Sequence, residues 1–541
     1  MVDLLHPNRT AHANDYFRGV RAIAPPKLVL IPAAIVVAAM IIPSGYLVLR
    51  AIGVGTEVID ILFRSRTMDI LVRSLMLMLA VAGASVLIAI PVGWLTVNTD
   101  LPFRGLFSVI TILPLVIPSY VGGFVLVVVL GPKGLLQEWL APLGVERLPE
   151  VYGFPGAMLT LTLLSYPYVL LPVRAALYSL DPSLNETSRS LGMNPTYTFF
   201  RVILPMLRPA IAGGAMLVAL YTLSDFGAVS LLHYETFTWA IYVQYGNFAR
   251  DVAAALSLVL IALAIFLITI DTSTRGKAKY YRDATGVARQ KLYRLGYWRW
   301  PAMLFCTTIV SLSLLAPISI LIYWVVRGIS HGEQLLILWD RLGNSLYVSG
   351  VAALMTVVAA MPLAILSARY QSRLSVLLER LSYIGFALPG IVVALAVVFF
   401  GVRYIPYFYQ TLALLIFAYI VLFLPAALGS IRTSLVAVSP MLEEASRSLG
   451  RSRFTTFATI TLPLIKPGII SGIIMVLMLS MKELPATLIL GPIGFKTLST
   501  TIWWATEDGF FAQAAVPALL LILASSIPMA LLVWTGRKGV Y

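Results

Sequence analysis

The chain has 541 residues, of which 59% are hydrophobic and 12% charged, and its mean hydropathy is +0.90. Because soluble domains carry about 25% charged residues, this composition excludes an ordinary soluble protein and indicates one embedded in lipid. A net charge of +15 would suggest a nucleic-acid partner for a soluble protein. In a membrane protein the distribution of the positive charges matters more than their sum.

Metal chemistry is disfavoured by the scarcity of cysteine and histidine. The only cysteine is Cys306, which excludes a disulfide within the chain and a cysteine-based metal or iron–sulfur site. The four histidines are scattered without ligand spacing: His6, His12, His233 and His331. We expect no bound cofactor, and the residues leave any metal ligands unknown.

Apolar stretches long enough to cross a bilayer recur along the whole chain. A hydrocarbon core of about 30 Å needs about 20 apolar residues in a helix, and lipid requires each span to be helical. The expected spans are 28–49, 71–97, 106–130, 156–180, 207–232, 252–271, 301–326, 345–367, 381–401, 411–433, 467–490 and 514–535. The sequence therefore predicts an all-α membrane protein with about twelve transmembrane helices.

The loop charges predict that both termini lie in the cytoplasm. Most of the lysine and arginine residues fall in the termini and in alternate loops, which is the positive-inside bias. The densest run, Arg275–Arg299, joins spans six and seven and contains interleaved tyrosines and a tryptophan. Such a run could bind nucleic acid, but between two spans a cytoplasmic linker that touches anionic lipid is favoured.

The chain repeats itself. Residues 74–118 match 345–389, with Pro91 on Pro362, and residues 174–230 match 432–488, with Gly192 on Gly450. The numbering offset between matching residues is 271 in the first pair of segments and 258 in the second. The extra residues of the first half therefore fall in the outside loop 131–156, where insertions are tolerated. We therefore expect two homologous six-helix halves, 1–271 and 301–541, joined by a basic cytoplasmic linker at 272–300. An even number of spans in each half makes the repeats parallel, related by an axis along the membrane normal.

A polar cytoplasmic segment lies between spans four and five of each half, at 181–206 and 439–464. Each predicts a short helix that opens at a proline and closes at a glycine able to adopt positive φ, Gly192 or Gly450. A second short helix follows, which we expect Pro205 or Pro463 to stop. A connector on the membrane surface would explain one copy, but less easily the same spacing in both.

At these residues the chain resembles the permease subunits of binding-protein-dependent ABC importers. The signature of that family is Glu-Ala-Ala, three residues, Gly, nine residues, then Ile-x-Leu-Pro. Both copies are similar to it: Glu186, Gly192 and Pro205 in the first, and Glu444, Gly450 and Pro463 in the second. Two permease repeats in one chain look like the fused iron(III) permeases. Thiamine and aminoethylphosphonate permeases share this fused design, so those substrates stay open.

The resemblance implies a transport subunit, and not an enzyme, in the inner membrane. It implies two copies of a cytoplasmic ABC ATPase subunit, which dock on the segments 181–206 and 439–464, and an external or periplasmic substrate-binding protein. The chain has no phosphate-binding loop of its own, since Gly276-Lys277 is followed by Ala278.

Because only Glu444 follows a second acid, Glu443, we expect neutralisation of Glu186 to impair coupling more than neutralisation of Glu444.

Two acids occupy equivalent positions in spans five and eleven. Asp225, Glu483 and the adjacent Lys482 are pathway candidates, since an ionisable residue in a span is a functional-site candidate. Carboxylate oxygens suit a hard cation such as ferric iron. The alternative is a structural ion pair with Lys482, because buried charges are usually paired. A secondary transporter could share the twelve spans, but it should carry more ionisable residues at the bilayer midplane.

Overall fold

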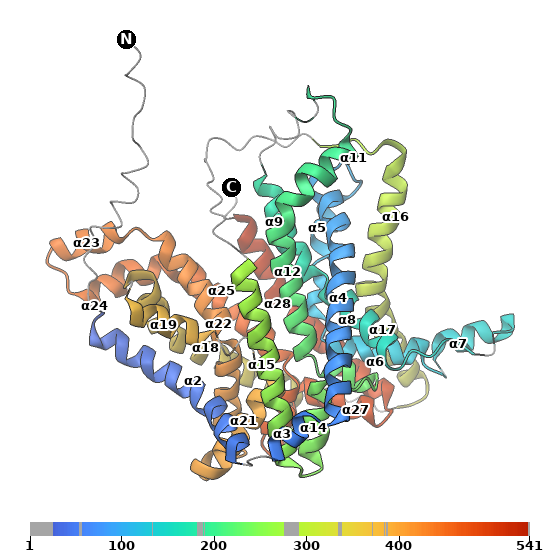
Figure 1. Ribbon diagram of the computed structural model, residues 1–541. Coiled ribbons are helices and arrows are strands. Elements are labelled where there is room, and N and C mark those ends of the chain that lie inside the picture. The colour runs from blue at the N-terminus through green and yellow to red at the C-terminus, as the bar shows by residue number, and fades with distance from the viewer. Residues whose placement is uncertain are drawn as a thin grey trace. The chain divides into compact units, whose positions relative to one another are not determined.

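The computed structural model describes residues 25–53, 57–132, 134–145, 147–180, 188, 190–274, 292–333, 338–370, 372–383, 385 and 388–538. Apart from one isolated β-bridge between Thr99 and Tyr293, the regular secondary structure of these residues is helical, and they contain no β-sheet (Figure 1). The predicted all-α class is therefore confirmed. The described residues form two compact units. Unit 1 lies within 1–42, 350–386 and 419–477, and unit 2 lies within 43–349, 387–418 and 478–541.

Eleven helical stretches among the described residues are long and apolar enough to cross a membrane. The helices that carry them are α2 (Lys27–Gly53), α4 (Ser65–Asn98), α6 (Ser119–Leu130), α8 (Phe154–Ser165) with α9 (Pro167–Ser179), α12 (Leu204–Ser224), α15 (Arg250–Thr274), α16 (Arg299–Val310) with α17 (Ala316–Ser330), α18 (Trp339–Arg369), α22 (Leu412–Ala437), α25 (Leu462–Met481) and α28 (Phe511–Lys538). The expected span 381–401 is the shorter apolar helix α21 (Gly390–Tyr404). The count agrees with about twelve spans.

The same close helix contact recurs in both halves. In unit 2, a Cβ on Gly214 of α12 would lie only 2.7 Å from the Cα of Val169 in α9. In unit 1, a Cβ on the equivalent Gly472 of α25 would lie 3.5 Å from the Cα of Ala427 in α22. Small residues let helix backbones approach closely in membranes. The repeat seen in the sequence is therefore also a repeat of packing.

Four of the expected spans are interrupted. The span expected at 106–130 is divided into α5 (Arg104–Ile110), η1 (Leu113–Val116) and α6, and α21 begins only after Pro389. The spans expected at 207–232 and 467–490 end at Ser224 and Met481, and each is followed by a short helix, α13 (Gly227–Leu231) or α26 (Pro485–Leu490). The two breaks fall at the two candidate acids.

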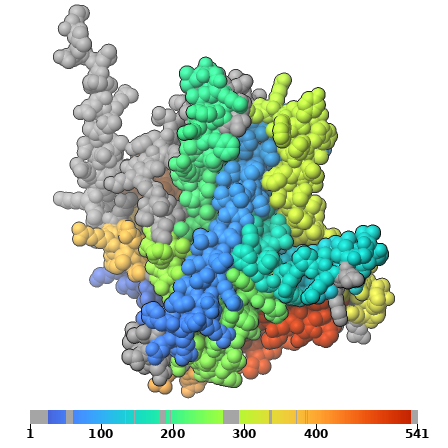
Figure 2. Space-filling view, turned by 45° about the vertical axis from the view of Figure 1, so that its right-hand side comes forward, coloured from blue at the N-terminus to red at the C-terminus, as the bar shows by residue number. Residues whose placement is uncertain are grey.

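The extra residues of the first half form a separate arm. The short helix α7 (Leu135–Leu140) lies in the outside loop where the register between the halves changes. Figures 1 and 2 show α7 extending from the side of unit 2. The Gln137 side chain stabilises this arm, because it donates to the carbonyl of Val145 and accepts from the amide of Leu148, both at 2.9 Å. The insertion therefore leaves the packed spans of unit 2 undisturbed.

Candidate functional site

The second polar segment folds into two short helices joined at a glycine. Helix α23 (Pro440–Ser448) begins directly after Ser439, and Gly450 takes φ +85° in the left-handed region. Helix α24 (Arg453–Thr456) follows, with the Ser452 hydroxyl accepting from the amide of Thr455 at 3.1 Å. The proline start and the positive-φ glycine agree with the predictions from sequence.

The first polar segment has the same turn. Gly192 takes φ +75°, and helix α11 (Pro195–Thr198) follows it. Residues 181–187 and Arg189 lie outside the described residues, and this includes Glu186, so its predicted role stays a prediction. We call the segments 181–206 and 439–464 the first and second coupling hairpins.

Pro205 and Pro463, near the ends of the coupling hairpins, do not stop a helix as expected. Five residues before each span are π-helical, Phe199–Ile203 ahead of α12 and Phe457–Thr461 ahead of α25. The amide of Leu204 therefore bonds the carbonyl of Phe199, and that of Leu462 bonds Phe457. The wider π turn accommodates Pro205 and Pro463, each of which lacks an amide donor, and the helix continues into the span.

A buried pair of hydroxyl groups joins the two helices of each hairpin. Ser188 Oγ lies 2.6 Å from Thr198 Oγ1, and Ser446 Oγ lies 3.0 Å from Thr456 Oγ1. All four residues are buried. Ser188 and Ser446 occupy the third position of the Glu-Ala-Ala signature, where the signature has alanine. This chain therefore adds a hydrogen bond inside each hairpin that alanine could not make.

The second hairpin is also anchored by a charge pair that was not predicted from the sequence. Arg369, at the end of α18, donates through Nε and Nη2 to one oxygen of Glu443, at 3.1 and 2.9 Å. The Thr461 hydroxyl donates to the same oxygen at 3.2 Å. In the first half the equivalent residues are Asn98 and Asn185. This paired replacement was the signal in the sequence that could have revealed the contact.

The anchored Glu443 changes the comparison of the two signature glutamates. Glu443 is committed to Arg369, whereas Glu444 is exposed. Part of the Glu443 carboxylate is therefore committed to another contact, while the expectation that Glu186 is the more sensitive of the two glutamates stays a prediction. Because the Arg369–Glu443 pair is largely removed from water, it holds the second hairpin in place more strongly than an exposed ion pair would.

The hairpins present apolar side chains to their surroundings. Leu191 is 69% exposed in the first hairpin, and Leu449 is 83% exposed at the equivalent position of the second. Phe454 is 77% exposed beside Gly450. Exposed apolar groups on short, polar helices are typical of surfaces that contact another protein.

The two candidate acids cap the short helices that follow them. An Asp225 carboxylate oxygen accepts from the amides of Ala228 and Val229 at 3.0 and 3.4 Å. At the start of α13, a Cβ on Gly227 would lie 3.0 Å from Ser119 Oγ in the first turn of α6. A Glu483 oxygen accepts from the amide of Ala486 at 3.2 Å, and it occupies the place into which a Cβ on Gly390 would project. Each acid thus lies between the first turns of two helices, where the helix dipoles favour an anion.

Lys482 has a different partner from the one the sequence suggested. Its ammonium group donates to the carbonyl of Leu115 at 2.7 Å, at the end of the short helix η1. Among the described residues Lys482 forms no ion pair with Glu483 or Asp225. The described residues also contain no group of three His, Cys, Asp or Glu side chains that could hold a metal ion.

These features define a class of protein: a multi-pass membrane permease made of two repeated halves, each with a polar helix hairpin before its fifth span. The chain belongs to the family of binding-protein-dependent transport system inner membrane components, whose model matches residues 85–275 and 360–537. Each match includes one coupling hairpin. The protein is therefore the membrane permease of an ABC importer.

Some similar proteins match most of the chain, and others match less than half of it. The chain is 38% identical over 497 residues to the Fe(3+)-transport system permease protein FbpB 2 of Haemophilus influenzae, which covers 91% of this chain and 95% of that protein. It is 25% identical to the ferric transport system permease protein FbpB of Actinobacillus pleuropneumoniae, over 77% of this chain and 64% of that protein. The molybdenum transport system permease protein ModB of Escherichia coli is 31% identical over 37% of this chain and 90% of its own length.

Proposed function

We propose that this permease imports ferric iron. The observation that carries the proposal is the 38% identity to an Fe(3+)-transport permease over nearly the full length of both chains. The relatives that match about one half differ in cargo, because ModB is named for molybdenum. Similarity to an iron permease across both halves therefore supports iron as the cargo more strongly than similarity to a permease that matches only one half would.

Energy reaches the permease through the two coupling hairpins in this proposal. The permease repeats are 1–271 and 301–541, joined by the linker 272–300, and one cytoplasmic ATPase subunit docks on each hairpin. The exposed Leu191 and Leu449 and the left-handed glycines beside them support this docking. The permease has an inward-facing and an outward-facing conformation. When ATP draws the two ATPase subunits together, they would bind one of these conformations more tightly and so favour it.

The spans turn this movement into transport. Both termini lie in the cytoplasm, as the charge bias suggests, so the hairpins face the ATPase subunits and the opposite ends of the spans face an external binding protein. Asp225 and Glu483 remain pathway candidates, since each acid lies at a break in a span. Their capping bonds support a role in holding those breaks in position. Membrane lipid, and no nucleic acid, contacts the basic linker.

The test is uptake by the complete reconstituted system. The permease, its ATPase subunits and its binding protein are placed in lipid vesicles, and uptake of radioactive ferric iron is measured with and without ATP. We expect ATP-dependent iron uptake that excess thiamine or aminoethylphosphonate does not reduce. ATP-dependent uptake of one of those solutes without iron uptake would keep the permease and overturn iron as its cargo.

A further inference from the structure

A cavity of about 520 Å³ in unit 2 contains two cations that have no acidic partner among the described residues. It lies between the first turn of α18, the helix α27 (Leu498–Glu507) and the start of α28. Arg341 and Lys496 line it together with Thr501, Trp504, Asp508 and Gln513. We call these six residues the basic cavity. Figure 1 shows α27 at the end of unit 2 that is remote from α11 and the first coupling hairpin.

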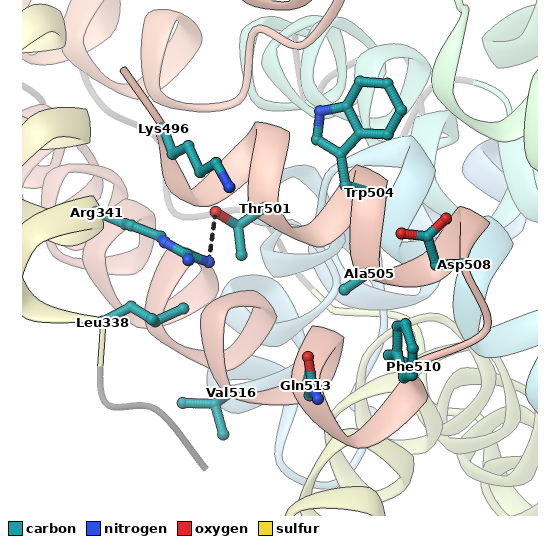
Figure 3. A pocket seen from close by; sticks show the side chains of 10 residues that line it. All are labelled: Leu338, Arg341, Lys496, Thr501, Trp504, Ala505, Asp508, Phe510, Gln513 and Val516. Atoms are coloured by element: carbon teal, nitrogen blue, oxygen red, sulfur yellow. Dashed lines mark hydrogen bonds between the residues drawn. The ribbon is translucent and has the colours of Figure 1, made fainter. Parts of the chain in front are cut away.

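The two cations converge on one hydroxyl group. Arg341 Nη1 donates to Thr501 Oγ1 at 3.2 Å, and Thr501 donates its own proton to the carbonyl of Thr497. Figure 3 shows the Lys496 side chain approaching the same hydroxyl from the other side, while Asp508 lies beyond, near Trp504 and Phe510. In the part of the chain that the structure describes, neither cation has a carboxylate within ion-pair distance.

The walls of the basic cavity are fixed by hydrogen bonds. The Asn344 amide donates to the carbonyl of Lys496 at 3.0 Å, which ties this loop to α18. The Ser345 hydroxyl accepts from the amide of Leu498 at 2.8 Å, where α27 begins. These two bonds fix the backbone of the loop that carries Lys496 relative to α18, the helix that carries Arg341.

The equivalent place in the first half holds a different set of charges. Glu235 is the repeat equivalent of Lys496 and precedes α14 (Phe237–Gly246), the counterpart of α27. Its carboxylate is held by Arg66 at 2.7 Å and by Arg73 at 3.4 Å. The same serine bond is present, because the Ser74 hydroxyl accepts from the amide of Phe237 at 3.3 Å. The first half thus supplies its own carboxylate to two arginines.

The second half lacks this ion cluster, because Ile337, Asn344 and Lys496 replace Arg66, Arg73 and Glu235. It instead carries Arg341, where the first half has Ile70. The basic cavity thus holds two cations, Arg341 and Lys496, and one acid, Asp508, which forms no ion pair with either of them among the described residues. We propose that it binds a carboxylate or phosphate group from outside the chain. Arginine forms paired hydrogen bonds with either oxyanion, and lysine adds a point charge. The volume lies within the range of small-molecule sites.

Calorimetry on the full-length permease in lipid nanodiscs tests the site, with sodium phosphate and sodium acetate as probes at constant ionic strength. We expect saturable binding of phosphate to the unaltered chain. Lys496→Glu replaces one of the two cations with a carboxylate, so it should weaken phosphate binding at least tenfold. Arg341→Gln should do the same. Arg403→Gln removes one exposed cation elsewhere in unit 2 and should leave binding unchanged.

Two results would overturn the proposal: no binding of either probe to the unaltered chain, or equal affinity in the Lys496→Glu variant. Thermal unfolding of each variant is measured alongside. If Lys496→Glu does not fold, Arg341→Lys takes its place. It keeps the charge but loses the paired donors, so it should bind phosphate more weakly than the unaltered chain and more tightly than Arg341→Gln, and equal affinity in all three would contradict the site.

A second arm distinguishes the source of the oxyanion. Association of the permease with its binding protein is measured with and without phosphate. Competition by phosphate identifies an acidic side chain of the binding protein as the ligand, whereas unchanged association identifies a free oxyanion. Only this arm rests on the proposed function, so failure of the calorimetric site and failure of the import function remain distinguishable.

Discussion

At the scale of single residues, the left-handed glycines set the direction of the second helix in each hairpin. A Cβ on Gly450 would meet no atom within 4 Å, so the cost of substitution comes from the backbone alone. That cost is about 1–2 kcal/mol for an ordinary L-residue in this conformation, and less for asparagine. We expect Gly450→Val to reduce ATPase association and coupled uptake, and Gly450→Asn to reduce them less.

A matched control for this prediction is Gly429→Ala. Gly429 lies inside α22, where an added Cβ would also meet no atom within 4 Å, and it has no positive φ. This variant should associate with the ATPase as well as the unaltered chain does. Equal binding by the Gly450 and Gly429 variants, measured by co-purification, would contradict a role for the left-handed turn.

The Arg369–Glu443 contact predicts a strong coupling between two substitutions. Arg369 and Glu443 side chains are only 12% and 24% exposed, so removing either leaves a poorly solvated charge. We expect Glu443→Gln or Arg369→Gln to lower the free energy of unfolding by about 1.5–3 kcal/mol. Arg369→Asn with Glu443→Asn copies the first half and should cost less than the sum of the single changes. Strict additivity in thermal unfolding would refute the pairing.

Local chain chemistry makes part of the site predictable at this scale. Glycine at 192 and 450 predicts positive φ because other residues are strained there. The contact between Arg369 and Glu443 joins residues far apart in sequence, and the sequence alone shows only their charges. The partner of Lys482 is a backbone carbonyl, and no side-chain pattern identifies such a group.

At the scale of structural elements, the hydroxyl pairs should fix the angle within each hairpin. Thr456→Val leaves the buried Ser446 hydroxyl without this partner, at a cost of about 1–3 kcal/mol. Adding Ser446→Ala removes the unsatisfied group, so the double variant should regain most of the stability. The measurement is thermal unfolding of all three variants. A double variant less stable than Thr456→Val would show that the hydroxyl pair is not the source of the effect.

The breaks in the spans give a second prediction at this scale. Asp225→Asn keeps an oxygen that can accept from Ala228, whereas Asp225→Ala does not. If the acid is mainly a helix cap, Asn should retain stability and uptake while Ala loses about 0.5–2 kcal/mol. If the charge serves the pathway, Asn should fold normally, associate with the ATPase and lose iron uptake. Glu483→Gln and Glu483→Ala are the matching pair in the second half.

Elements were predictable where hydrophobicity alone decides them. The apolar stretches identified the spans, because lipid accepts only long apolar helices. Hydrophobicity does not report where a span is interrupted, so 106–130 and 381–401 were expected as continuous helices. The prolines at 205 and 463 were expected to end helices, since the rule for α-helices does not include a π turn that accommodates them.

At the scale of the whole chain, the two halves share a sequence repeat but differ in how each hairpin is held. Arg369 anchors the second hairpin, and Asn98 replaces it in the first half. In unit 2, Trp94 packs against Phe199 at the start of the π turn and against Tyr293 at the end of the linker, with ring centroids 4.9 and 5.4 Å apart. The linker thus contributes to the surroundings of the first hairpin, and repeat alignment could not predict this.

Coupled import depends on the docking of one ATPase subunit on each hairpin, and cross-linking tests this docking most directly. The chain has one cysteine, Cys306, which is buried, so a cysteine placed at Leu191 or Leu449 provides an exposed thiol for a short thiol-to-amine cross-linker. We predict that Leu191→Cys and Leu449→Cys each cross-link one ATPase subunit, whereas Tyr407→Cys, at a residue that is 94% exposed, cross-links none. Failure at both hairpins, or equal cross-linking at Tyr407, would contradict docking at the hairpins.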